Sequence, residues 1–286
     1  MHLSLVASRF LASLFKRLYF VIFALPIGLI VFWLGGYFLL AAVVLVIFLA
    51  ALEYASLFQA VGYHPSRVLV IGGSLVFIIT RYFQGFEYSH LWLSAAILCS
   101  MAYHLLDFEK EKHTKGGFDF TITLTGMLYF GWLGGYILSL RALPDGFWWL
   151  LLSLGTVWMV DIGGYTIGRP FGKHPFFPHL SPRKTWEGFI GGILGGAVGG
   201  SLVWLLWQTL SANTFPHLAY AKVLLFGIVL ALLTPLGDLG ESMVKRQAGV
   251  KDSSQLIPGH GGMWDRIDSW LWSVCIGYYL ITNWFL

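Results

Sequence analysis

Two pairs of carboxylates lie close to apolar segments near the end of the chain. Asp238 and Glu241 are three residues apart in "LTPLGDLGESMVKR", and Asp265 and Asp268 are three residues apart in "DRID". Side chains at this spacing share one face of a helix, so each pair can present both acids in one direction. Two such helix ends could bring three or four carboxylates together. Hard oxygen ligands of this kind suit Mg²⁺, which commonly bridges a carboxylate and substrate phosphates.

Each pair also has a simpler explanation. Acids are favourable at the start of a helix, where an aspartate can cap it, and this would account for Asp265 and Asp268. The first pair could form ion pairs with Lys245 or Arg246, which follow it. The segment "PGHGG" between the pairs favours a site instead, because its glycines let backbone N–H groups approach an anion closely.

Basic and hydroxyl side chains surround this glycine segment. Lysine and arginine can neutralise phosphate charge, and arginine can do so through two parallel hydrogen bonds. The segment is not a Walker A loop, because the sequence contains no GxxxxGK[ST] pattern. The histidines lack the spacing of a zinc site, so we expect His260 to be a donor or a loop residue. The candidates for phosphate binding in this segment are Ser242, Lys245, Arg246, Lys251, His260, Gly261, Gly262 and Arg266.

A second polar segment, "DIGGYTIGRPFGKHPFFPHLSPRKTWEG", has similar chemistry. It begins with Asp161 inside an apolar run, where an uncompensated carboxylate is costly. Pro182 suggests a helix-opening sequence whose donors face a ligand. A basic loop on the inner side of a membrane is a simpler explanation for its charges. The candidate binding residues here are Asp161, Arg169, Lys173, Ser181, Arg183, Lys184, Thr185 and Glu187.

The composition indicates an integral membrane protein. Hydrophobic residues make up 57% of the 286 residues, and Asp, Glu, Lys and Arg make up 11%, against roughly 25% in soluble proteins. The net charge of +4 is explained by basic residues on the cytoplasmic side, which argues against nucleic-acid binding. Cys99 and Cys275 lie within apolar runs and form no metal-binding pattern.

Nine apolar segments are long enough to span a membrane, which needs about 20 residues. We therefore predict an all-α fold, with the first span kept as an anchor rather than cleaved. Glycines at 188, 192 and 196 have the spacing of closely packed membrane helices. The expected spans are 18–35, 37–59, 67–84, 90–106, 120–140, 146–165, 188–210, 219–240 and 268–285.

The distribution of basic residues predicts the orientation. With the N-terminus in the cytoplasm, 15 of the 18 Lys and Arg residues fall on the inner side, and Arg81, Arg141 and Lys222 fall on the outer side. The C-terminus is then outside. The polar loops 166–187 and 241–267 both reach the cytoplasmic face, where nucleotides are found.

The polar segment near the C-terminus resembles the signature of the phosphatidate cytidylyltransferases, also called CDP-diacylglycerol synthases. That pattern contains a serine, Lys-Arg, Lys-Asp, His-Gly-Gly and Asp-Arg-x-Asp at fixed spacing. It is matched by Ser242, Lys245, Arg246, Lys251, Asp252, His260, Gly261, Gly262, Asp265, Arg266 and Asp268. The segment 161–188 is similar to a second shared region of that family. The resemblance covers about 161–268, and before that only hydropathy agrees.

The resemblance implies an enzyme that makes CDP-diacylglycerol and diphosphate from CTP and phosphatidate in phospholipid biosynthesis. It implies Mg²⁺ bound by Asp238, Asp265 and Asp268, and it leaves open a second or monovalent cation. Residues 120–286 would then form the catalytic part, residues 1–119 would be N-terminal membrane helices, and the subunits would form a homodimer. A bacterial source would place the protein in the cell or inner membrane. The resemblance further implies that Lys245, Arg246, Lys251 and Arg266 bind phosphates and that Arg183 and Lys184 bind the nucleotide. Asp161 and Glu241 would belong to the substrate site and orient the metal ligands or the bases.

Two other functions stay open at this point. A CTP- or ATP-dependent kinase of a lipid alcohol would also need a cytoplasmic metal–phosphate site between membrane helices. A cation transporter could use Asp161, Asp238 and Glu241 as an intramembrane relay. Transporters more often contain paired halves, and this sequence has no clear internal repeat.

Overall fold

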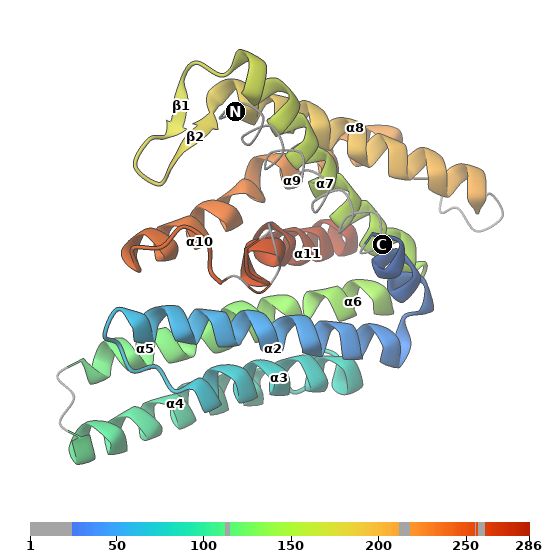
Figure 1. Cartoon of the computed structure of the whole chain (residues 1–286). Coiled ribbons are helices and arrows are strands. Elements are labelled where there is room, and N and C mark those ends of the chain that lie inside the picture. The colour runs from blue at the N-terminus through green and yellow to red at the C-terminus, as the bar shows by residue number, and fades with distance from the viewer. Residues whose placement is uncertain (1–24, 112–114, 212–217, 255, 257–260) are drawn as a thin grey trace, which may run out of the picture.

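The computed structural model describes residues 25–111, 115–211, 218–254, 256 and 261–286. Helices form most of this part of the chain (Figure 1). The first described helix is Leu25–Leu34. It is followed by α2 (Gly36–Ala60), α3 (Arg67–Gln84), α4 (Ser89–Glu111), α5 (Gly116–Gly126), the π-helix η1 (Met127–Trp132), α6 (Tyr136–Ala142), α7 (Gly146–Phe171), β1 (Pro175–Phe177), β2 (Ser181–Thr185), α8 (Trp186–Leu210), α9 (Tyr220–Leu233), α10 (Pro235–Gln247) and α11 (Trp264–Trp284).

Seven helical stretches in the described residues are long and apolar enough to cross a membrane. They are Gly36–Ala60, Arg67–Gln84, Ser89–Lys110, Gly116–Ala142, Gly146–Phe171, Trp186–Leu210 and Tyr220–Gln247. These stretches coincide with the second to eighth expected spans, which confirms a helical multi-pass membrane protein.

The first and ninth expected spans differ from the others. The first, 18–35, is described from residue 25 onward, as the short helix Leu25–Leu34. The ninth corresponds to α11, which has 21 residues but is not among the seven long apolar stretches. The count of nine spans and the orientation remain predictions.

The first polar loop contains a short hairpin within an otherwise helical fold. β1 and β2 pair in the antiparallel direction, with Phe177 opposite Ser181, and helices form the rest of the regular structure in the described residues, as predicted. Pro182 lies in β2 rather than in a helix opening, as the preference of residues before proline for extended backbone allows. α8 begins after Thr185, whose side chain accepts a hydrogen bond from the N–H of Gly188 at 3.2 Å.

The second polar loop begins later than expected. The helix continues through α10 to Gln247, so the loop predicted from residue 241 starts at residue 248. Glu241 and Lys245, four residues apart, form an ion pair along this helix, in the order that stabilises helices. The carboxylates of the first pair therefore lie on a rigid element.

The helices are arranged around α11. In Figure 1, α2 to α6 lie on one side of it, and α7, α8 and α9 lie on the other. α11 packs against α2, α6, α7 and α9. Trp264, at the start of α11, is buried, and its ring lies 5.3 Å from Tyr54 of α2 and 5.5 Å from Phe130 of η1. These aromatic contacts hold the acidic end of α11 against the first half of the chain.

Glycines allow α7, α8 and α9 to pack with their backbones close together. A Cβ atom at Gly191 would lie 2.6 Å from the carbonyl oxygen of Gly163, and one at Gly196 would lie 2.6 Å from that of Gly227. Such distances leave no room for a larger side chain. This confirms the prediction that the glycines of the 188–200 segment serve helix packing.

Candidate functional site

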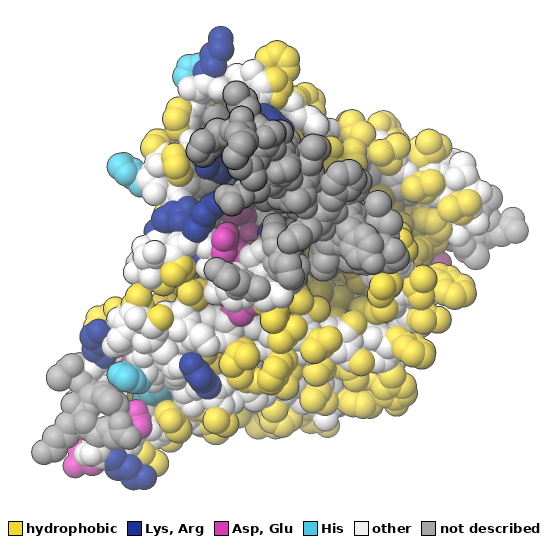
Figure 2. Space-filling view, in the orientation of Figure 1, with side chains coloured by type: hydrophobic (Ala, Val, Ile, Leu, Met, Phe, Trp, Pro, Cys, Tyr) yellow, Lys and Arg dark blue, Asp and Glu magenta, His cyan; other side chains and the backbone are white. Residues whose placement is uncertain are grey.

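A cavity of about 540 Å³ lies between α7, the hairpin, α8 and α10. Its charged lining comes from Asp161 and Arg169 on α7, Arg183 and Lys184 on β2, and Asp238 on α10. Other parts of its wall are apolar and include Val160, Gly192, Ala231 and Pro235. Figure 2 shows basic and acidic side chains gathered on this face of the molecule between largely hydrophobic regions. The cavity can therefore receive a molecule that carries both charge and apolar groups.

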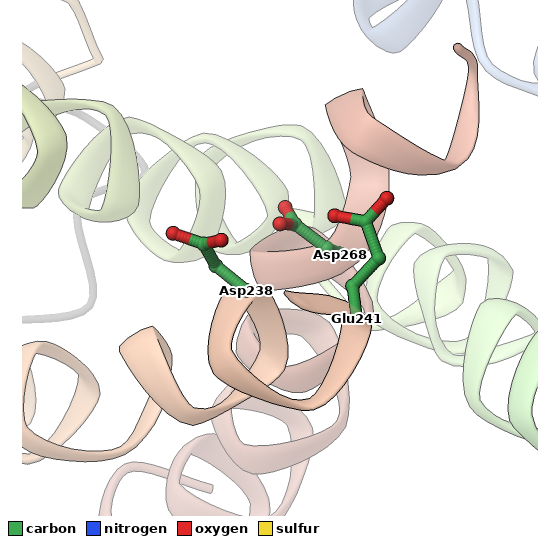
Figure 3. A group of neighbouring side chains, drawn as sticks. All are labelled: Asp238, Glu241 and Asp268. Atoms are coloured by element: carbon green, nitrogen blue, oxygen red, sulfur yellow. The ribbon is translucent and has the colours of Figure 1, made fainter. Parts of the chain in front are cut away.

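Three carboxylates form a cluster at one edge of this cavity. Asp238 and Glu241 extend from α10 and Asp268 extends from α11, and one oxygen of each lies within 4.8 Å of the others (Figure 3). Glu241 and Asp268 are buried, whereas Asp238 is partly exposed to the cavity. We call these three residues the acidic cluster.

The acidic cluster has the properties of a cation site. The Oε1 atom of Glu241 is buried and has no hydrogen-bond partner among the described residues. An unpaired carboxylate oxygen in a buried position is costly unless a cation or a proton compensates it. The cluster supplies hard oxygen donors, so it could hold a metal ion such as Mg²⁺.

Asp265 does not belong to this cluster in the described structure. Its Oδ1 atom lies 2.6 Å from Nζ of Lys245, and its Oδ2 atom accepts hydrogen bonds from the N–H groups of Ser253 and Gly262, both at 2.8 Å. Burial opposes ionisation of this carboxyl, but the hydrogen bonds from Lys245, Gly262 and Ser253 outweigh burial and lower its pKa to about 2. Asp265 therefore stays charged and ties the loop before α11 to α10.

Two lysines connect these carboxylates to their surroundings. Nζ of Lys245 lies 3.0 Å from Glu241 and also contacts Asp265, so one ammonium group links the acidic cluster to the loop. Lys184 forms an ion pair with Asp238. This pair connects β2 to α10 across the cavity, and it is a direct contact between the two polar parts of the chain predicted to act together.

Hydrogen bonds hold the hairpin at its base and at its turn. Glu187 accepts hydrogen bonds from the N–H groups of Lys173 and His174 at 3.1 and 3.3 Å, and its other oxygen lies 2.6 Å from Nδ1 of His174. Arg246 of α10 donates to the carbonyl oxygen of Leu180 at 3.3 Å. Glu187 and Arg246 thus position the segment that carries Arg183 and Lys184.

The other candidates have varied surroundings. Arg169 donates to the hydroxyl group of Tyr165 at the cavity wall, and the hydroxyl group of Ser242 lies 3.4 Å from Oδ1 of Asp238. Lys251 and Arg266 are exposed. Thr185 lines the cavity, Ser181 begins β2, and the N–H of Gly262 is used by Asp265. The neighbouring Gly261 has a φ of +80°. His260 lies outside the described residues.

One buried carboxylate next to the site was not among the candidates. Glu53 of α2 accepts hydrogen bonds from the loop before α11. A sequence signal existed, because Glu53 is an acid inside the apolar run 37–59, and ionisable residues in such runs tend to be functional.

Comparison with known proteins points in one direction. The sequence profile of the cytidylyltransferase family matches residues 15–284. A protein named phosphatidate cytidylyltransferase from Synechocystis sp. is 32% identical over 282 residues, covering 87% of this chain and 90% of that protein. Proteins of the same name from Staphylococcus haemolyticus and Mycobacterium leprae are 35% and 44% identical, covering 69% and 43% of this chain and 72% and 36% of their own lengths.

Proposed function

This chain belongs to the cytidylyltransferase family, and we propose that it transfers the cytidylyl group of CTP to phosphatidate. The products are CDP-diacylglycerol and diphosphate. The observation that carries the proposal is the position of the acidic cluster beside a cavity with a basic wall and an apolar wall. CTP and phosphatidate are both polyanions, and phosphatidate also brings acyl chains.

The reaction requires little acid–base chemistry. An oxygen of the phosphatidate phosphate forms a bond to the α-phosphorus of CTP, and the bond from that phosphorus to the bridging oxygen breaks, which releases diphosphate. The attacking oxygen is already anionic at neutral pH, so no strong general base is needed. The protein must instead hold two polyanions together and neutralise their charge.

Basic side chains of the cavity supply that neutralisation. Arg183 and Lys184 on β2 and Arg169 on α7 face the cavity, where they would bind the phosphates of CTP. Ser181, Thr185 and Lys173 belong to the same segment. The exposed Arg246, Lys251 and Arg266 would contact phosphates once substrates bind. Lys245 is buried between Glu241 and Asp265 and would act through these carboxylates. Val160, Gly192 and Ala231 provide an apolar wall for the part of phosphatidate next to its glycerol.

The acidic cluster would hold Mg²⁺ through Asp238, Glu241 and Asp268. When bound, the ion would neutralise phosphate charge at the reacting α-phosphate. Ser242 and Lys184 contact Asp238 and would orient its carboxylate. Asp161, on the cavity wall, would orient the nucleotide or the ligands of the ion. Asp265 would support the site from the loop rather than bind the ion directly.

The proposal extends to the location of the site and to assembly. The 15 basic residues assigned to the inner side support a cytoplasmic N-terminus and an active site on the cytoplasmic face. Residues 120–286 would supply the substrate-binding side chains. The family resemblance supports a homodimer in the membrane.

Transfer of the α-phosphorus distinguishes this reaction from a lipid kinase reaction. We expect purified protein with phosphatidate, Mg²⁺ and CTP labelled at the α-phosphate to place the label in lipid. CTP labelled at the γ-phosphate should release its label as diphosphate. Label from the γ-phosphate in lipid would identify a kinase, and cation flux in proteoliposomes without nucleotide would identify a transporter. Parallel reactions with ATP, GTP and UTP test whether the base is recognised.

A further inference from the structure

Glu53 is a buried carboxylate that contacts a loop 200 residues away in the sequence. Its side chain is 7% exposed, within the apolar helix α2. An uncompensated carboxylate in this position would be strongly destabilising. Its two oxygens instead lie close to four donors: the hydroxyl groups of Ser253 at 3.0 Å and Ser254 at 2.6 Å, and the N–H groups of Met263 and Trp264, both at 2.9 Å.

Two of these donors are backbone groups at the beginning of α11. The first N–H groups of a helix have no acceptor within the helix, and a negative charge near them is favourable. Glu53 therefore acts on α11 as a cap supplied by a different helix. α11 carries Asp268 of the acidic cluster, so the position of that carboxylate depends on how the helix begins.

Glu53 also explains one glycine of the His-Gly-Gly signature. A Cβ atom at Gly262 would lie 2.4 Å from Oε2 of Glu53 and 2.0 Å from Oγ of Ser253. Neither neighbour has space to move, because both are buried and hydrogen-bonded to each other. The glycine is thus needed for the close approach of the loop to Glu53.

A continuous series of contacts connects Glu53 to the acidic cluster. The hydroxyl group of Ser253 lies within hydrogen-bond distance of both Glu53 and Asp265, and it donates to one of them at a time. Asp265 contacts Lys245, and Lys245 contacts Glu241. Glu53 is not among the residues that line the cavity.

From these contacts we infer that Glu53 is a positioning residue for cytidylyl transfer. It fixes the loop 261–264 and the first turn of α11, and thereby the placement of Asp268 and Glu241. The first half of the chain therefore contributes to the active site without contacting substrate. The inference rests on the proposed function for its catalytic consequence, whereas its structural part can be measured separately.

The test compares Glu53→Gln with Tyr54→Phe. Glutamine keeps the size of the side chain but turns an NH₂ group toward N–H donors, so at least one contact to the loop is lost. Tyr54→Phe removes a partly buried hydrogen bond of the adjacent residue of α2, in which the hydroxyl group donates to the carbonyl oxygen of Ile122 at 2.9 Å. It leaves the contacts of Glu53 in place and is the matched control.

Two measurements are made on the purified full-length proteins. In steady-state assays, we expect Glu53→Gln to lower kcat roughly tenfold to hundredfold, because small displacements of catalytic groups have effects of this size. The KM for CTP should change by less than about threefold, since the basic residues of β2 are held by other contacts. In amide hydrogen exchange, peptides within 253–268 should exchange faster in Glu53→Gln, whereas Tyr54→Phe should match the parent in both measurements.

Each outcome decides the inference. A Glu53→Gln protein with the parent's kcat contradicts it, and so does a slow variant whose exchange within 253–268 is unchanged. If Glu53→Gln does not fold, Ser254→Ala removes one of the same contacts. It should show the same local exchange and a kcat lower by about threefold to tenfold. A Ser254→Ala protein whose amide exchange and kcat both equal those of the parent would then contradict the inference. An inactive parent would refute the proposed function instead, and the exchange measurement would still test the placement of Glu53.

Discussion

At the scale of single residues, the partner of each carboxylate determines its role. Asp265 is satisfied by Lys245 and by the N–H groups of Ser253 and Gly262, so it organises the loop. Glu241 retains a buried oxygen without a partner among the described residues, so this carboxylate could bind a cation. Asp265 and Asp268 lie about one helical turn apart, but their side chains have different roles.

A substitution at Lys184 tests whether the hairpin binds the nucleotide. Removing its ammonium group in Lys184→Ala deletes a charge-assisted contact to phosphate, which is worth roughly 1.5–3 kcal/mol, or on the order of 10- to 150-fold. We expect the KM for CTP to rise by about this factor and the KM for phosphatidate to rise less. His179→Ala, an exposed residue between the two strands, is the control. Equal increases in both KM values for Lys184→Ala would show that the hairpin does not select the nucleotide.

At the scale of helices and strands, the apolar spans could be predicted from the sequence, but the contacts between distant segments could not. Spans such as 67–84 follow from length and apolarity, because a membrane helix must satisfy its backbone internally. The hairpin could not be predicted, because strands of three and five residues leave almost no periodic pattern. Glu53 was missed because its partners lie about 200 residues away, and Asp265 was grouped with Asp268 because spacing alone does not reveal which neighbours capture a side chain.

The packing of α8 against α7 provides a prediction at this scale. A Cβ atom at Gly195 would lie 2.1 Å from the carbonyl oxygen of Met159, whereas a Cβ atom at Gly72 of α3 would meet no atom within 4 Å. Gly195→Ala should therefore separate the two helices and cost about 1–3 kcal/mol of stability. Gly72→Ala should be neutral. Thermal unfolding in detergent measures both, and an unchanged Tm for Gly195→Ala would show that the helices do not pack this closely.

At the scale of the whole molecule, the polar residues of distant segments meet at one place. The hairpin after α7 and the beginnings of α10 and α11 converge on the cavity, and α2 supports the beginning of α11 through Glu53. If the orientation is as proposed, this place faces the cytoplasm, and the substrates meet where CTP is available.

The orientation can be tested with single cysteines in a protein that lacks Cys99 and Cys275. His179→Cys and Gln247→Cys are exposed on the hairpin and at the end of α10, and both should react with an impermeant thiol reagent from the cytoplasmic side only. Glu87→Cys, exposed between α3 and α4, should react from outside. Labelling of the first two in sealed cells would reverse the proposed orientation.

The central claim is that the acidic cluster holds the cation used in transfer, and Asp268→Asn tests it most directly. Asparagine keeps the size of this buried side chain, and folding should survive because a neutral amide is less costly to bury than a charge. Asp265→Asn is the matched control, since it lies one turn away and outside the cluster. The measurement is binding of Mn²⁺, as a spectroscopic substitute for Mg²⁺, together with the transfer rate. We predict that Asp268→Asn loses the bound ion and at least about 10²-fold in rate, whereas Asp265→Asn keeps the ion. A folded Asp268→Asn protein that binds Mn²⁺ as the parent does, or that retains activity within about threefold, would contradict the claim.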